Sequence, residues 1–261
     1  MKANGKITLV IPAAGRGKRL FCGNGSTPKG MVPINGRPLL EYVLEAGMQT
    51  PIRDIVIILS PTGDSIKEYF GHTWRGIPIY YAIQDEPRGL ADAVSCAEPL
   101  VAHLMLVING DEIYVGGRVA EIFDYYQHRD ANGVVGYLRT TAEDPRIRLG
   151  YGLDVDHDQR VQRLVEKPPC PWNDLLGVGV WLLGREYFRY FERTAIHEER
   201  GERDFVAVLQ AMVADGRTIY GLDLDAEFVN VTVPEDIVRA EAALSRATWS
   251  SNMCLAATVG V

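Results

Sequence analysis

The sequence lacks the features that would place a protein in a membrane or in an oxidising compartment. Its cysteines, Cys22, Cys96, Cys170 and Cys254, are widely spaced, with no C-x-x-C pair and no Cys/His cluster. This spacing gives no support to a zinc site or a disulfide framework. The apolar run after Lys6 is too short for a signal peptide, and no run approaches the roughly 18 residues that span a bilayer. We therefore predict a cytoplasmic protein with no membrane partner.

The chain also lacks an excess of positive charge, with 27 Lys and Arg against 34 Asp and Glu and a net charge of −7. A nucleic-acid-binding protein normally presents a basic face, so we predict no nucleic-acid partner. Hydrophobic residues make up 47% and charged residues 23% of the 261 residues, which is typical of a globular protein. This length favours a single domain over residues 1–247. The tail at 248–261 has little periodicity, and we predict a loop or a partner-facing segment there.

What the sequence does contain, near its start, is an apolar strand pattern at 7–12 that runs into a cationic loop. The loop carries Gly15 and Gly17, and the cations Arg16, Lys18, Arg19 and Lys29 have no acidic residue among them. Glycines admit positive φ and bring N–H groups close to an anion, while Arg and Lys add charge and directional donors. The pattern favours a polyphosphate site, and an ordinary solvated loop remains the alternative at this point.

Short apolar runs alternate with amphipathic stretches along most of the chain, which is typical of strand–helix units around a parallel sheet. We predict strands at 7–12, 55–59, 79–82, 103–108, 134–138, 150–156, 160–166, 177–183, 218–222 and 227–229. We predict helices at 38–49, 64–70, 90–101, 119–128, 185–191, 205–215 and 232–247, the last opened by a capping box from Thr232 to Glu235. The pair at 150–166 makes the sheet mixed. Asp111 follows a central strand, where open α/β sheets bind ligands.

Two common nucleotide motifs do not fit the loop. A dinucleotide-binding fingerprint needs a third glycine where Leu20 stands, and an acidic residue about twenty positions later, where the chain has Ile34, Asn35 and Gly36. A P-loop needs Ser or Thr where Arg19 follows Lys18. A dehydrogenase and a P-loop NTPase are therefore disfavoured.

A third class fits, because several segments resemble the sugar nucleotidyltransferases, and most closely the short glucose-1-phosphate thymidylyltransferases without a C-terminal β-helix. The resemblance covers roughly residues 7–245 and rests on these segments: Gly15-Arg-Gly17-Lys-Arg19-Leu20, Pro28-Lys29, Pro33-Ile-Asn-Gly-Arg-Pro38, Gln84-Asp-Glu-Pro-Arg-Gly89-Leu-Ala-Asp-Ala93, Asn109-Gly110-Asp111, Gly150-Tyr151-Gly152 and Val165-Glu166-Lys167-Pro168.

The resemblance implies a Rossmann-like three-layer αβα fold with a mostly parallel, mixed central sheet. It implies Mg²⁺-dependent condensation of a nucleoside triphosphate with a sugar-1-phosphate, giving a nucleotide sugar and pyrophosphate. The nucleotide half would be about 1–115 and the sugar half about 116–247. The implied residues are Arg19, Lys29 and Lys167 for catalysis; Ala14, Gly15, Gly17, Gln84, Gly89 and Asp111 for the nucleotide; Tyr151, Gly152, Glu166 and Lys167 for the sugar; and Asp111 and Asn230 for the metal.

The chain departs from the family pattern in two places, and these keep alternatives open. Lys18 replaces a usual threonine, and Asn230 stands where the family usually has a second metal-binding aspartate. Asparagine supplies a neutral oxygen and removes one negative charge. The Gln84 amide favours dTTP or UTP, because it can both donate to and accept from a pyrimidine imide edge. The alternatives are a cytidylyltransferase acting on a sugar or alcohol phosphate, or a non-catalytic regulatory module of the same fold; a homo-oligomer is left open.

Overall fold

A computed structural model of the chain describes residues 7–15, 17, 19–20, 27–198 and 200–258, with side chains up to residue 247. Its centre is a ten-stranded mixed sheet of order β11-β10-β12-β7-β1-β4-β6-β5, in which β9 pairs with β12 and β13. The strands of this sheet are β1 (Ile7–Pro12), β4 (Ile52–Leu59), β5 (Thr73–Trp74), β6 (Ile77–Ile83), β7 (Leu104–Ile108), β9 (Gly133–Arg139), β10 (Tyr151–Val155), β11 (Val161–Glu166), β12 (Leu175–Gly184) and β13 (Ile219–Asp223).

The half of the sheet that contains β1 is parallel, apart from its short edge strand β5, and the other half is mixed. Strands β7, β1, β4 and β6 are parallel neighbours, as are β9 and β13, whereas β12 is antiparallel to β7, β9 and β10. Two small ribbons lie outside the sheet: β2 (Pro33–Ile34) with β3 (Arg37–Pro38), and β8 (Glu112–Val115) with β14 (Glu227–Asn230). The parallel strands therefore end at one edge, where the loops after β1, β4, β6 and β7 meet.

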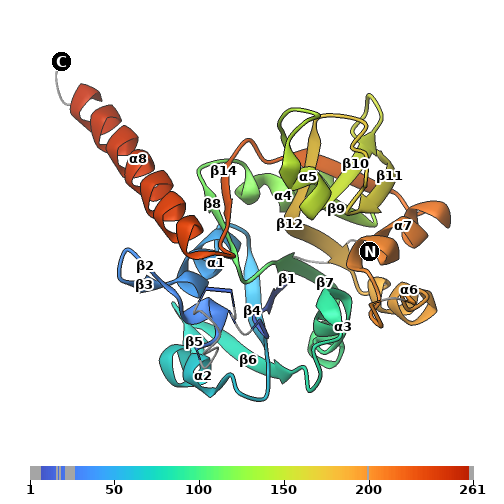
Figure 1. Cartoon of the computed structure of the whole chain (residues 1–261), viewed down its shortest axis with the longest axis horizontal. Coiled ribbons are helices and arrows are strands. Elements are labelled where there is room, and N and C mark those ends of the chain that lie inside the picture. Colours follow the sequence, from blue (N-terminus) through green and yellow to red (C-terminus); the bar gives the residue numbers. More distant parts are fainter. Residues whose placement is uncertain (1–6, 16, 18, 21–26, 199, 259–261) are drawn as a thin grey trace.

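Helices cover both faces of the sheet (Figure 1). The α-helices are α1 (Leu39–Gly47), α2 (Asp64–Phe70), α3 (Gly89–Ser95), α4 (Ile122–His128), α5 (Pro145–Leu149), α6 (Tyr187–Arg193), α7 (Phe205–Ala214) and α8 (Pro234–Thr258), with single 3-10 turns η1 (Lys29–Met31), η2 (Glu98–Leu100) and η3 (Val119–Glu121). None of the described helices combines the length and the hydropathy needed to cross a bilayer.

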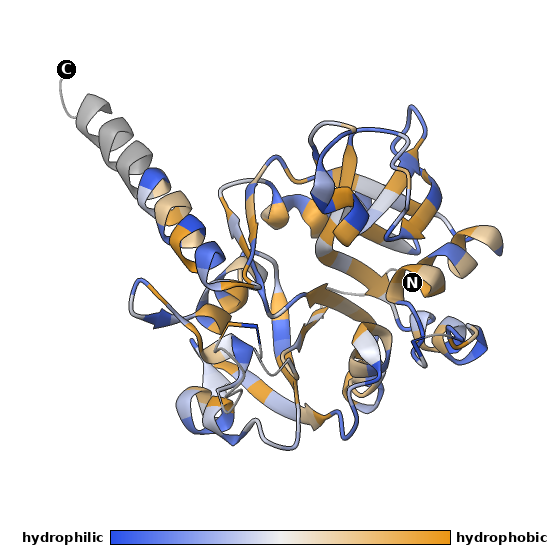
Figure 2. Cartoon of the chain, viewed as in Figure 1, coloured by the Kyte–Doolittle hydropathy of each residue, from blue (hydrophilic) through white to orange (hydrophobic). Residues whose placement is uncertain are grey.

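The three layers follow from side-chain alternation along the buried strands. In β1, Leu9 and Ile11 pack into the cluster that contains α1, α2 and α4, whereas Val10 packs into the cluster that contains α3, α6 and α7. Both faces of β1 are apolar, as expected of a central parallel strand. In Figure 2 the strands β7 and β12 are hydrophobic along most of their length, whereas the helices carry both hydrophobic and hydrophilic residues. The predicted αβα fold with its mixed sheet is confirmed.

Most predicted elements are present, with boundaries shifted by a few residues, and α2 has the predicted bounds. The strands β2, β3, β5 and β8 and the helix α5 were not predicted, because each has five residues or fewer and shows no periodicity. The helix predicted at 90–101 is shorter than expected: α3 ends at Ser95 and a 3-10 turn follows.

The C-terminal predictions were wrong in two respects. The segment after 247 is not a loop, because α8 continues to Thr258 through a stretch that contains no Gly or Pro to stop it. Helix α8 also does not begin with a Thr232–Glu235 capping box. Instead Asp236 reaches back and accepts hydrogen bonds from the backbone N–H groups of Thr232 (2.8 Å) and Val233 (2.9 Å).

Candidate active site

The loop after β1 lies at the edge where the parallel strands end, and a backbone hydrogen bond joins its two ends. Lys29 N–H donates to the Gly15 carbonyl at 3.0 Å, and Gly17 takes a φ of +58°, which favours glycine. This closure brings Lys29 back beside the glycines although it lies 14 residues after Gly15. The predicted supporting cations Arg16 and Lys18 lie outside the described residues.

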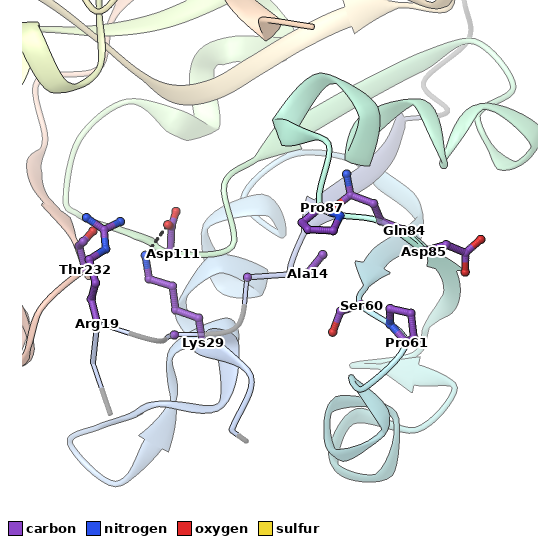
Figure 3. A pocket seen from close by; sticks show the side chains of 12 residues that line it. Ala14, Arg19, Lys29, Ser60, Pro61, Gln84, Asp85, Pro87, Asp111 and Thr232 are labelled. Carbon is purple, nitrogen blue, oxygen red and sulfur yellow. Dashed lines mark hydrogen bonds and ion pairs between the residues drawn. The ribbon is translucent and has the colours of Figure 1, made fainter. Parts of the chain in front are cut away.

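A pocket of about 410 Å³ lies over this loop. Among its lining residues are five that were predicted to bind the nucleotide, Ala14, Gly15, Gly17, Gln84 and Asp111, and two that were predicted to be catalytic, Arg19 and Lys29. The other lining residues are Ser60, Pro61, Asp85, Pro87 and Thr232. Figure 3 shows Gln84 and Asp85 on one side of this pocket and Arg19, Asp111 and Thr232 on the other. The pocket is therefore elongated, with its polar amide at one end and its cations at the other.

Lys29 and Asp111 are joined across the cationic end of the pocket. Lys29 Nζ lies 2.5 Å from Asp111 Oδ2, and their side chains are 13% and 33% exposed (Figure 3). Asp111 reaches this place because Gly110 packs tightly on β1: a Cβ on Gly110 would lie 2.5 Å from the Pro12 carbonyl oxygen. The Gly110-Asp111 pair therefore depends on the close approach of the β1 and β7 ends.

The amide of Gln84 has a fixed orientation at the other end of the pocket. Its Nε2 donates to the Gly89 carbonyl (3.0 Å) and to Asp92 Oδ2 (2.9 Å), and the residue is only 6% exposed. Both partners are acceptors, so the NH₂ group must face them. The carbonyl oxygen of Gln84 is then the polar atom left to face a ligand. The sequence predicts an amide that both donates to and accepts from the base. In the structure both N–H donors of Gln84 are bonded to Gly89 and Asp92, so only the oxygen is left for the base.

A second pocket of about 390 Å³ continues from the first along the sheet edge. It shares Ala14, Gly15, Lys29, Gln84, Pro87 and Asp111 with the first pocket and adds, among others, Gly89, Asn109 and Glu202. Gly89 has a φ of +87°, and a Cβ there would meet the Glu202 carboxylate at 2.5 Å. A third pocket of about 230 Å³ shares Leu90, Asn109 and Glu202 with the second. The three pockets thus form one cleft.

The third pocket contains three of the four residues predicted to bind the sugar. Tyr151, Glu166 and Lys167 line it, together with Glu112, Gly177, Gly179 and Asn230. The fourth, Gly152, is buried in β10 against Trp172, Ile147 and Pro168, and it is not among the lining residues of this pocket. The alternation along β10 places Tyr151 and Gly152 on opposite faces of the strand.

Two glycines in β12 leave space for this pocket because they have no side chain. A Cβ on Gly177 would lie 2.0 Å from the Tyr151 ring, and one on Gly179 would lie 2.4 Å from Glu112 Oε2. The Tyr151 hydroxyl lies 3.2 Å from the Val178 carbonyl oxygen and accepts from Trp181 Nε1 at 3.0 Å. The Tyr151 ring therefore forms a wall of the pocket, while its hydroxyl belongs to the core.

Glu166 and Lys167 stand side by side at the end of β11. Lys167 has a φ of +45° and donates its N–H to the Gly150 carbonyl at 2.7 Å, and its Nζ lies 3.7 Å from Glu166 Oε1. Burial raises the pKa of Glu166 to about 7, an effect that the charge of Lys167 opposes. The Lys167 side chain is half exposed, so its ammonium group is accessible to an anion in the pocket.

Glu112 is a site residue that sequence reasoning missed. It is 5% exposed and accepts hydrogen bonds from the Gly179 N–H (2.8 Å), Asn109 Nδ2 (3.0 Å) and the Tyr114 hydroxyl. Burial, and then the charge of Asp111, raises the pKa of Glu112 to about 7. The only signal in the sequence was an acidic residue directly after Asp111, and its partner Gly179 lies 67 positions later.

Asn230 lies at the end of β14, opposite Glu112 in the ladder with β8, and the next residue, Val231, donates its N–H to the Asp111 carbonyl at 2.8 Å. The strand ends that carry Asp111 and Asn230 are therefore adjacent. Asn230 Oδ1 accepts from the Thr232 hydroxyl at 2.9 Å. Among the described residues there is no group of three or more His, Cys, Asp or Glu side chains that could hold a metal ion.

Comparison with known proteins identifies relatives along nearly the whole chain. The family described as Nucleotidyl transferase matches residues 8–249. The UTP–glucose-1-phosphate uridylyltransferase AglF of Haloferax volcanii is 26% identical over 246 residues, which cover 93% of this chain and 98% of that protein. Other relatives are longer, and the chain spans about half the length of some of them.

Two solved structures have the same fold. A UDP-glucose pyrophosphorylase complexed with UDP-glucose superposes with a TM-score of 0.81 at 20% identity, covering 92% of this chain and 98% of that one. A putative glucose-1-phosphate thymidylyltransferase from Bacillus anthracis gives a TM-score of 0.80 at 21% identity, covering 91% and 95%. At such identities the likeness shows the fold alone.

Proposed function

Because the chain belongs to the nucleotidyl transferase family, we propose that it condenses UTP or dTTP with a sugar-1-phosphate to give a nucleotide sugar and pyrophosphate. The observation that carries the proposal is the single cleft with a cationic nucleotide end, at Arg19 and Lys29, and a separate pocket beside Lys167. A relative named as a UTP–glucose-1-phosphate uridylyltransferase matches 93% of the chain, which supports the same substrate classes.

The chemistry requires little from the protein beyond positioning and charge. An oxygen of the sugar phosphate attacks the α-phosphorus of the triphosphate, the new P–O bond forms, and the bond to the bridging oxygen of the β-phosphate breaks to release pyrophosphate. The attacking phosphate is already anionic at pH 7, so no activated Ser, Cys or His is needed. Catalysis then consists of holding two anions in line and neutralising the leaving group.

The residues divide between the two anions according to their places in the cleft. Arg19 and Lys29 line the first pocket and would hold the triphosphate, while the backbone at Ala14, Gly15 and Gly17 would approach it closely. Lys167 lines the third pocket and would hold the sugar phosphate. Tyr151 would form the wall beside the sugar, and Glu166, whose carboxylate faces the same pocket, would accept hydrogen bonds from its hydroxyls.

Nucleotidyltransferases of this family generally use a divalent metal, and the donors near Asp111 fit Mg²⁺. Asp111 supplies a carboxylate that is one-third exposed, and Asn230 an amide oxygen on the adjacent strand end. Both are the hard oxygen donors that Mg²⁺ prefers, and it is commonly held by one or two protein oxygens together with substrate phosphates. When bound, the ion would neutralise charge on the phosphate oxygens.

The fixed amide of Gln84 favours a pyrimidine with a protonated N3. Its free carbonyl oxygen can accept from the N3–H of uracil or thymine, whereas the N3 of cytosine is itself an acceptor. The facing oxygen and nitrogen would repel each other, which disfavours the cytidylyltransferase alternative. Gly89, whose carbonyl anchors Gln84, lines the same end of the cleft.

The test is a matrix of four nucleoside triphosphates against several sugar-1-phosphates, with pyrophosphate release as the readout. We expect turnover with UTP or dTTP, and Lys167→Ala should abolish it while circular dichroism stays native. Lys67→Ala, which removes an exposed lysine on α2, is the matched control and should keep full activity. Full turnover by folded Lys167→Ala would contradict the assignment, and nucleotide-sugar binding without turnover would favour the regulatory module.

A further inference from the structure

The carboxylate of Glu202 lies in the cleft, in the second pocket that Gln84, Lys29 and Asp111 also line. Glu202 lies between α6 and α7, yet its Oε2 reaches Gly89 at the start of α3, where a Cβ would lie 2.5 Å away. The φ of +87° at Gly89 and this contact both require glycine there. Glu202 lines the second and the third pockets, so its carboxylate stands where the two substrates meet.

The charge of Glu202 is only weakly neutralised. Within the described part of the chain its ion-pair partner is Arg200, whose Nε lies 4.0 Å from Glu202 Oε1, and the guanidinium of Arg200 is also paired with Asp204. The Glu202 side chain is 28% exposed, and the residue lines the second and third pockets. A partly buried carboxylate without strong partners is available to accept hydrogen bonds from a ligand.

The residues that line the second pocket indicate which part of a bound nucleotide would lie beside Glu202. The pocket is lined by Gln84, where the base would sit, and by Lys29 and Asp111, where the phosphates would sit. In any nucleoside triphosphate the ribose lies between these two parts. Its 2′- and 3′-hydroxyls are adjacent donors that suit a carboxylate, a pairing found at other nucleotide sites.

We infer that Glu202 is a specificity-determining residue that accepts a hydrogen bond from the ribose 2′-hydroxyl, so that the enzyme takes a ribonucleotide, UTP, in preference to dTTP. The inference rests on the proposed nucleotide site and deepens it, because that proposal leaves UTP and dTTP open and a relative of the chain is named as a UTP–glucose-1-phosphate uridylyltransferase. A deoxyribonucleotide would leave the carboxylate facing only the 3′-hydroxyl, and a partly buried acceptor that loses one of its donors costs free energy.

The experiment separates the sugar hydroxyl from the base methyl group. UTP, dUTP, 5-methyl-UTP and dTTP form a complete set in which the 2′-hydroxyl and the 5-methyl group vary independently. For the wild type we expect kcat/KM to fall about tenfold or more from UTP to dUTP, and by the same factor from 5-methyl-UTP to dTTP. Glu202→Ala should lose the preference, so that its kcat/KM is similar for UTP and dUTP and similar for 5-methyl-UTP and dTTP.

The dUTP activity of Glu202→Ala also reports that the variant is folded. Glu202→Gln, which keeps one acceptor oxygen without the charge, should restore part of the preference for UTP. Glu198→Ala removes an exposed acid from the same loop and should keep the wild-type ratio. Equal use of UTP and dUTP by the wild type, or an unchanged ratio in Glu202→Ala, would overturn the inference.

Binding without a sugar phosphate keeps the two proposals apart. Calorimetric titration of UTP and dUTP involves no turnover, so it remains informative even where no sugar-1-phosphate is accepted. A UTP preference that disappears in Glu202→Ala supports the inference even if no pyrophosphate is ever released, in which case only the proposed function fails. Turnover without any difference between UTP and dUTP in either assay overturns the inference and leaves the proposed function standing.

Discussion

Lys29 Nζ and Asp111 Oδ2 lie 2.5 Å apart although their residues are 82 positions apart in the sequence. One follows β1 and the other follows β7, two neighbouring parallel strands. In the proposed function Lys29 binds the triphosphate and Asp111 binds the metal, so in the absence of substrates each neutralises the other. A metal on Asp111 would release Lys29 toward the phosphates, and a phosphate on Lys29 would release Asp111. The ion pair therefore couples the two binding events.

This coupling predicts opposite effects of Lys29→Met on the two ligands. Without nucleotide, the variant should bind Mn²⁺, a spectroscopic substitute for Mg²⁺, about threefold to tenfold more tightly, because Asp111 is no longer paired. With metal present, it should bind UTP more weakly, because a phosphate ligand is lost. Electron paramagnetic resonance measures the first and calorimetry the second. Lys67→Met should change neither, and weaker Mn²⁺ binding by Lys29→Met would disprove the coupling.

The oriented amide of Gln84 predicts a strong preference for UTP over CTP. Gln84→Leu keeps the volume and removes the acceptor oxygen, so kcat/KM for UTP should fall about tenfold while that for CTP changes little. Gln162→Leu, at an exposed position on β11, is the control. A variant that keeps the wild-type ratio of UTP to CTP would show that base recognition lies elsewhere.

The loop motifs could be predicted from the sequence because each is local. A strand pattern that ends in Gly15 and Gly17, or in Gly110-Asp111, needs no knowledge of the rest of the chain to predict a ligand-binding edge. The order of strands in the parallel half then brings these edges together. Lys29 and Asp111 were therefore both assigned to the cleft without any knowledge of their contact.

The remaining features depend on contacts between distant segments, which no local pattern encodes. Glu112 is a site residue because Gly179, on another strand, leaves room for its carboxylate. The Gln84 amide is oriented by Asp92 on α3. Even the start of α8 was misjudged, because Thr232 and Glu235 fit the capping pattern while Asp236 makes the hydrogen bonds.

The raised pKa of Glu166, about 7, predicts a pH dependence of sugar-phosphate binding. Above pH 7 the carboxylate is charged and accepts hydrogen bonds from sugar hydroxyls; below it the group is protonated, so KM for the sugar phosphate should rise while KM for UTP stays nearly constant. Glu166→Gln should have a high KM without this step. The second ionisation of the substrate phosphate, near pH 6, affects both proteins equally. An unchanged profile in Glu166→Gln would contradict the assignment.

The raised pKa of Glu166 also predicts that the stability of the fold falls as pH rises, whereas binding of the sugar phosphate improves. The pKa rises from 4.5 to about 7 on folding, so the folded state binds a proton more tightly than the unfolded state. The free energy of unfolding should therefore fall as pH rises from about 4.5 to about 7. Glu166→Gln removes this loss and should raise Tm at pH 8 while lowering activity. A lower Tm at pH 8 would show that ionised Glu166 stabilises the fold.

Gly177 lines the third pocket, which is the proposed sugar site, at a position that leaves no room for a methyl group. In Gly177→Ala the new Cβ would lie 2.0 Å from the ring of Tyr151, so the ring has to shift against the hydrogen bonds that tie its hydroxyl to the core. We expect a loss of about 1–3 kcal/mol in the free energy of unfolding and a higher KM for the sugar phosphate, because Tyr151 must move into the third pocket.

Gly184→Ala is the matched control on the same strand, since its Cβ would meet nothing closer than the Asn132 carbonyl oxygen at 3.7 Å. That variant should stay within about 0.5 kcal/mol of the wild type, as surface substitutions usually do. Urea denaturation measures the free energy of unfolding of both variants. A rise in KM for the sugar phosphate without a rise in KM for UTP distinguishes a local change at the pocket from a general loss of stability. If Gly177→Ala were destabilised but bound sugar phosphate normally, Tyr151 would not be a wall of the sugar pocket.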